Sequence, residues 1–125
     1  MSSTSVALDG MEAHMEGLES VWEGGMRDAY AFYRPQASPA VALAAAMVES
    51  ALALQELGGR PPAPSHLLLG DLCLARASRL LAEERDQRLQ VGFARAMELV
   101  AAAAAGGPSS PPLRALLVAA IGSPA

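Results

Sequence analysis

The stretch SHLLLGDLCLARASRLLAEE, Ser65 to Glu84, decides the fold of this 125-residue chain. It predicts a helix about 30 Å long, because each residue of an α-helix adds about 1.5 Å. Ser65 is a candidate N-cap, since its hydroxyl can accept a hydrogen bond from a free backbone N–H. Leucines occur on opposite sides of this helix, and only a narrow strip carries charge. A helix that is apolar on nearly every side is usually buried, so we expect it at the centre of the fold.

A Gly70-Asp71 pair interrupts the middle of this apolar stretch. The positions three and four residues from Asp71, which share its helix face, are all apolar: Leu67, Leu68, Leu74 and Ala75. An unpaired buried carboxylate would cost several kcal/mol. We therefore expect Asp71 to have a partner, which could be an N–H, an arginine or a water. We expect Gly70, which has no Cβ, to mark a close approach of a neighbouring helix.

Proline and glycine divide the rest of the chain. Ser38-Pro39 predicts the start of a second apolar helix, from Ala40 to about Leu57, with the serine as N-cap and the proline at the first helical position. The Gly- and Pro-rich segments 58–64 and 106–108 predict breaks. After the charged residues 83–88 we expect a fourth helix to about Ala105. A short helix follows the second serine-then-proline signal, Ser109-Ser110-Pro111-Pro112, and ends at Gly122 and Pro124.

The segment 5–33 predicts an amphipathic N-terminal helix, which Gly24-Gly25 breaks or kinks. Its apolar positions alternate in steps of three and four and include Met15, Trp22, Ala29 and Phe32. Acidic residues repeat at the same spacing on another face: Asp9, Glu12, Glu16, Glu19 and Glu23. We interpret this acidic face as a solvated surface, and a binding surface is the alternative.

No alternating β pattern occurs in the sequence, so we predict an all-α bundle of about five helices. The chain forms a single domain, 1–125, with an N-terminal amphipathic segment (5–33), core helices (34–105), and a loop with a short final helix (106–125). We expect a cytoplasmic protein with no signal peptide and no spanning helix, because the N-terminus lacks a basic region and apolar runs are short.

Composition argues against several classes of function. The net charge of −4 leaves no basic stripe for nucleic acid. The single Cys73 cannot form an internal disulfide, which fits a reducing compartment, and we interpret it as a small buried hydrophobic residue. One cysteine with two distant histidines, His14 and His66, cannot form a zinc site.

The stretch LLLGDLCLARASRLLAE resembles a helix of the trans-polyprenyl diphosphate synthase family. The residues in matching order are Gly70, Asp71, Leu74, Ala77 (or Ala75), Leu80, Leu81 and Ala82. Upstream, AAAMVESALALQEL resembles the family's helix that ends in its first aspartate-rich motif, and GGRPPAPSH resembles a shortened form of the loop between these helices. The resemblance covers about residues 34–105 and implies a truncated isoprenoid-synthase-like bundle.

The departures from the family bear on function. Active members place two adjacent aspartates and a third nearby where this chain reads Gln55-Glu56-Leu57-Gly58-Gly59, with a single acid. The basic residues that clamp diphosphate are reduced to Arg60 and Arg27, and the sequence ends before the second aspartate-rich motif. The resemblance therefore implies the non-catalytic small subunit (component I or A) of a heteromeric hexaprenyl or heptaprenyl diphosphate synthase.

In that interpretation the chain binds no cofactor, and magnesium and both substrates bind the catalytic partner. The small subunit is needed for activity and influences product length. The candidate interface or structural residues are Gly70, Asp71, Leu74, Gln55, Glu56 and Arg60. We expect self-association of the chain alone, because two nearly all-apolar helices need more cover than short neighbours supply. A homodimeric helical scaffold is the alternative, and a small enzyme in its own right is the third possibility.

Overall fold

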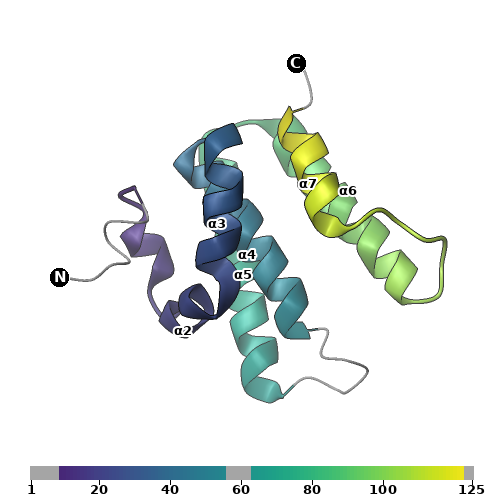
Figure 1. Ribbon diagram of the computed structural model, residues 1–125, viewed down its shortest axis with the longest axis horizontal. Helices are drawn as coiled ribbons and strands as arrows, with labels where there is room; N and C mark the ends of the chain where they lie inside the picture. The colour runs from purple at the N-terminus through teal and green to yellow at the C-terminus, as the bar shows by residue number, and fades with distance from the viewer. Residues whose placement is uncertain (1–8, 56–62, 123–125) are drawn as a thin grey trace.

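The computed structural model describes residues 9–55 and 63–122. A short 3-10 turn, η1 (Glu12–Met15), precedes a kinked helix made of α2 (Glu19–Val21), the π-turn η2 (Trp22–Met26) and α3 (Arg27–Tyr33). The turn η3 (Arg34–Gln36) is followed by α4 (Pro39–Gln55), α5 (Pro64–Glu84), α6 (Gln87–Ala104) and α7 (Leu113–Gly122) (Figure 1). The described ranges contain no strand, and the predicted all-α bundle of about five helices is confirmed.

Helix α4 forms the centre of the fold. Every residue from Val41 to Val48 is buried, so this part of the helix is covered on all of its sides. It packs against α3, η2, α5 and α7 (Figure 1), and its alanines let these neighbours approach closely. The expectation that the 65–84 helix occupies the centre was therefore wrong. The second apolar helix of the sequence holds that place.

Helix α5 is buried along one face only. Its buried residues are Gly70, Cys73, Ala77, Leu80 and Leu81. In contrast, Leu67 and Leu68 are 42% and 70% exposed. The sequence correctly places leucines on several sides of this helix, but burial also depends on how many neighbours a helix has. Helix α5 packs mainly on α4 and less on α6, so much of its surface stays in solvent.

The predicted serine N-cap is confirmed at the start of α4 and wrong at the start of α5. Ser38 is an N-cap, because its hydroxyl accepts a hydrogen bond from the Val41 N–H at 3.3 Å, and Pro39 is the first residue of α4. Ser65 is not an N-cap: Ala63 has that position and Pro64 begins α5. Proline suits a first helical position because its φ is already helical and its missing N–H has no partner there. The predicted end of α4 near Leu57 lies outside the described residues.

The charged segment 83–88 contains the end of one helix and the start of the next. Arg85 ends α5 in the left-handed region, with φ of 56°. The Asp86 carboxylate then caps α6 by accepting hydrogen bonds from the N–H groups of Arg88 and Leu89 at 3.1 and 3.3 Å. The final helix α7 begins at Leu113, after the two prolines, and Gly122 is its last residue.

The N-terminal segment kinks at the predicted glycines. Gly25, inside η2, has a φ of 148°, which favours glycine. A π-turn adds a residue to the helical repeat and rotates the following turns. Beyond the kink Ala29 is buried as expected, together with Tyr30 and Tyr33, whereas Phe32, also expected on the apolar face, is 41% exposed. Before the kink Met15, Leu18 and Trp22 are buried as expected. The predicted continuous helix is wrong there, because the 3-10 turn η1 ends at Met15 and α2 begins only at Glu19.

One arginine of α5 holds the N-terminal segment in place. The Arg76 guanidinium donates to the carbonyl of His14 at 2.9 Å and to the carbonyl of Glu16. Beyond this anchor, the acidic face agrees with the interpretation as a solvated surface. Its exposed members are Asp9, Glu16, Glu19 and Glu23, and Glu12 is half-buried.

Candidate functional site

The Gly70-Asp71 pair lies on the outer side of the α4–α5 contact. Asp71 is exposed, so the expectation of a carboxylate on a buried helix was wrong. Water can solvate an exposed carboxylate, and no buried partner is required. The Gln55 side-chain N–H donates to Asp71 Oδ1 at 3.4 Å, which is long for a hydrogen bond. Asp71 is therefore a surface residue, whereas Gly70 is buried.

The side chains around Asp71 are also largely on the surface. Leu67, Leu68 and Ala75 are exposed and Leu74 is half-buried. Because these positions are three and four residues from Asp71, they surround the carboxylate on one helix face. We call this surface the Asp71 patch, consisting of Leu67, Leu68, Asp71, Leu74 and Ala75. It places one negative charge at the centre of an apolar area.

Gly70 lies beneath this patch, at a close contact between α4 and α5. A Cβ added at Gly70 would lie 2.9 Å from Gln55 Nε2 and 3.1 Å from Gln55 Cγ. The nearest atoms all belong to the Gln55 side chain, so Gly70 makes room for that side chain of α4. The structure brings Gly70, Asp71 and Gln55 together, with Leu74 one turn further along α5. Glu56 and Arg60 lie outside the described residues.

A polar cluster that the sequence did not predict joins three helices. Glu49 of α4 accepts two hydrogen bonds from the Arg114 guanidinium of α7, from Nε and Nη2, each at 2.9 Å. Its carboxylate also accepts a hydrogen bond from the Tyr33 hydroxyl of α3. The Arg114 guanidinium carbon stands 4.2 Å from the centroid of the Phe32 ring. The sequence offered one signal for this contact: Glu49 and Arg114 are charged residues on two otherwise apolar helices.

The electrostatics of this cluster are those of a structural contact. Burial, then the hydrogen bond to Glu49, raises the pKa of Tyr33 well above its ordinary value. The hydrogen bonds to Glu49 raise the pKa of Arg114. Both groups therefore keep their protons at any physiological pH. The Glu49 carboxylate is occupied by these two partners.

A second cluster ties the start of the described chain to α3. The Tyr30 hydroxyl donates to Asp9 Oδ2 at 2.6 Å, and Arg34 Nε donates to the same oxygen at 3.1 Å. The hydrogen bond from Tyr30, followed by that from Arg34, lowers the pKa of Asp9. Arg27, the other basic residue considered for diphosphate, pairs instead with Glu23.

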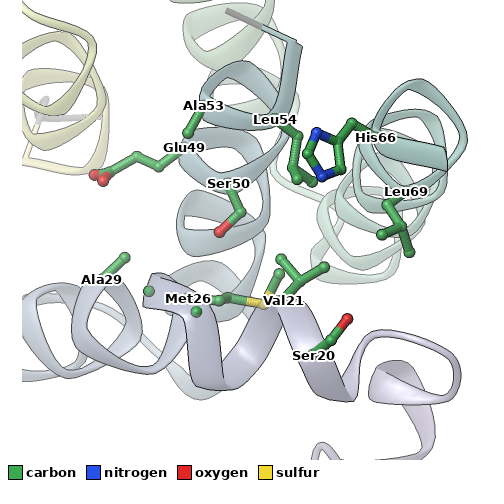
Figure 2. A pocket seen from close by; sticks show the side chains of 12 residues that line it. Ser20, Val21, Met26, Ala29, Glu49, Ser50, Ala53, Leu54, His66 and Leu69 are labelled. Atoms are coloured by element: carbon green, nitrogen blue, oxygen red, sulfur yellow. The ribbon is translucent and has the colours of Figure 1, made fainter. Parts of the chain in front are cut away.

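A cavity of about 430 Å³ lies between η2, α4 and α5. Figure 2 shows the His66 ring reaching from α5 toward Leu54 of α4, and the Ser50 side chain on the same side of α4 as Val21 and Met26. The Glu49 carboxylate, also at the edge of the cavity, points away toward α7 (Figure 2), where Arg114 binds it. His66 Nδ1 is buried without a hydrogen-bond partner.

The remaining candidate groups are the single cysteine and the potential metal ligands of the described residues. Burial raises the pKa of the Cys73 thiol to about 11, so it stays protonated at neutral pH. This agrees with its interpretation as a small buried hydrophobic residue. Within residues 9–55 and 63–122, no three His, Cys, Asp or Glu side chains converge as metal ligands would. No helix in the described ranges is both long and apolar enough to cross a membrane.

Fold and site define a small all-α protein with an apolar patch around one exposed carboxylate. Comparison with known protein families, curated proteins and solved structures gave no match. The functional argument therefore depends on the residues of the chain itself.

Proposed function

We propose that this chain is the non-catalytic small subunit of a heteromeric long-chain polyprenyl diphosphate synthase. The Asp71 patch is the observation that carries the proposal, because it is an apolar surface with a charge at its centre. Contiguous apolar surface on a small protein often marks a binding site for another protein. The patch lies on the helix that resembles the synthase family.

The arrangement of α4 and α5 supports the same proposal. The family resemblance rests on two successive helices joined by a Gly- and Pro-rich loop, and here those two helices pack on each other. The patch is on the side of α5 that faces away from the buried residues Cys73, Ala77 and Leu80. A partner can therefore dock on α5 without opening the core of this chain.

The charge of Asp71 indicates the chemistry of the partner surface. A matching surface is apolar and carries an arginine or a lysine opposite Asp71, since a carboxylate buried at an interface needs a cation. In the proposed assembly the catalytic subunit supplies the magnesium and both substrate sites. This chain completes the assembly and influences product length.

The same charge distinguishes this proposal from a homodimeric scaffold. A twofold dimer puts the same patch of both copies against each other. Two Asp71 carboxylates would then face one another near the axis, and like charges at an interface are destabilising. The homodimer remains the alternative function, and dilution of the purified chain in sedimentation equilibrium measures it.

Copurification tests the proposed function. A tagged catalytic synthase from the same genome is coexpressed with this chain and captured. We expect the wild-type chain to be retained and Leu68→Glu to be lost, because Leu68 is 70% exposed at the edge of the patch. Val91→Glu is the matched control, since Val91 is 58% exposed on α6, outside the patch. Equal capture of both variants, or no capture of the wild type, refutes the proposal.

A further inference from the structure

We propose that the cavity between η2, α4 and α5 is a binding site for a neutral, mainly apolar small molecule with one hydrogen-bonding group. This inference is independent of the proposed function, because the cavity and the Asp71 patch are formed by different residues of α5. His66 and Leu69 line the cavity, whereas Leu67, Leu68 and Asp71 belong to the patch.

The size of the cavity fits a small ligand. Its volume of about 430 Å³ falls within the range of small-molecule pockets. A water molecule occupies about 30 Å³ of liquid, so this volume has room for roughly a dozen non-hydrogen atoms. Apolar side chains form its wall on three sides: Val21, Met26 and Ala29 before and after the kink, Leu54 from α4, and Leu69 from α5 (Figure 2).

One polar atom at the cavity lacks a partner. His66 Nδ1 is buried without a hydrogen bond, and leaving such an atom unsatisfied is destabilising. Imidazole nitrogens donate or accept according to the tautomer. The hydroxyls of Ser20 and Ser50 line the same cavity. Nδ1 itself has no accessible surface, so a ligand hydroxyl or carbonyl pairs with it when the His66 ring turns toward the cavity.

The charges around the cavity select a neutral ligand. The described lining residues include no arginine or lysine that could balance an anion. Glu49 is the acidic residue at the edge, but its carboxylate is occupied by Arg114 and Tyr33. A cation would lack a free carboxylate, and an anion would lack a basic side chain to balance it. Both signs of charge are thus disfavoured.

An entrance to the cavity lies beside the kink. Gly24, Gly25 and Ala53 line the cavity and are exposed, so it opens to solvent between η2 and α4. A Cβ added at Gly24 or Gly25 would meet no atom within 4 Å, so space remains open at the kink. The π-turn places two residues without side chains at the entrance, which allows a ligand to enter.

Solution NMR with 1-octanol as the probe tests the site. Titration into the full chain should give saturable shifts in the methyl signals of Val21, Met26, Leu54 and Leu69. Octanoate and octylammonium, with the same chain length and opposite charges, should bind at least fivefold more weakly. Absence of saturable shifts, or shifts spread over Leu68 and Val91 on the outer surface, overturns the proposal. An octanoate affinity equal to that of octanol overturns the neutral assignment.

Two variants separate the cavity from non-specific binding. Ala53→Phe fills the entrance and should abolish octanol binding, whereas Ala94→Phe, on the exposed side of α6, should leave it unchanged. His66→Phe keeps a ring of similar shape and removes the hydrogen bond, so the dissociation constant should rise at least fivefold. Unchanged octanol affinity in both Ala53→Phe and His66→Phe contradicts the assignment.

Discussion

The Glu49–Arg114 pair should contribute measurably to stability, because it joins α4 to α7 through two parallel hydrogen bonds. The two residues are 65 positions apart in sequence, so the pair can form only when the bundle is folded. We expect Arg114→Met to lower the free energy of unfolding by about 2 kcal/mol. That value combines a charge-assisted contact with the lost stacking over Phe32.

The solvent exposure of the Glu49 and Arg114 side chains determines how much the pair contributes to stability. The side chains of Glu49 and Arg114 are 20% and 43% exposed. Breaking a fully buried ion pair costs about 3–5 kcal/mol, whereas an exposed pair contributes about 0.2–1 kcal/mol. The pair lies between these cases, and water screens the arginine. We therefore expect a coupling energy of about 1–2 kcal/mol between Arg114→Met and Glu49→Gln, the latter retaining an acceptor for Tyr33.

Urea unfolding of the wild type, both single variants and the double variant measures this coupling. Trp22 is the only tryptophan and is fully buried, so its fluorescence reports the transition. The matched control is the Arg79–Glu83 pair on α5, which is 3.7 Å apart and exposed at both side chains, with an expected coupling below about 0.5 kcal/mol. If both cycles give the same coupling, the structural role assigned to Glu49 and Arg114 is refuted.

Three further predictions follow from the described contacts. Cys73, whose pKa is raised to about 11 by burial, should react with a maleimide at pH 7.5 only after unfolding, and rapid labelling of the folded chain contradicts this. Gly70→Ala should change the free energy of unfolding by less than about 1 kcal/mol, because the gain in helix propensity offsets displacement of the flexible Gln55 side chain. Gly70→Val should destabilise the chain by more than Gly70→Ala. Equal urea midpoints for the two variants refute the close contact. Asp9 has a lowered pKa, so its contribution to stability is present above its ordinary value of 3.8 and is lost as pH falls through the folded value; the stability difference between wild type and Asp9→Asn should therefore shrink below about pH 4, and a difference that grows on acidification contradicts the Tyr30 contact.

Local signals in the sequence predicted local structure well. The Ser38-Pro39 start of α4 and the kink at Gly24-Gly25 depend on residues that are neighbours in sequence, and both appear as expected. The N-cap of α5 was placed two residues late, because Ala63 rather than Ser65 has that position and Pro64 begins the helix. Each of these features is decided by backbone conformation within one helical turn.

Burial and long-range contacts could not be predicted in the same way. Helices α4 and α5 look similarly apolar, but only α4 has neighbours on every side, and Leu68 of α5 is 70% exposed. The π-turn rotates the helix that follows it, so Tyr30 and Tyr33 lie in the core and Phe32 does not. The Glu49–Arg114 pair and the cavity at His66 depend on how separate helices meet. The sequence identified Gly70, Asp71 and Gln55 as candidate residues. Only the structure shows that Gly70 is buried, Gln55 half-buried and Asp71 exposed.

The most direct test of the proposed function is the turnover of a catalytic polyprenyl diphosphate synthase from the same genome. The rate with allylic diphosphate, isopentenyl diphosphate and magnesium is measured alone, then with an equimolar amount of this chain. The proposal predicts that the wild-type chain and Val91→Glu raise the rate, whereas Leu68→Glu does not. An unchanged rate and product length with the wild-type chain would contradict it.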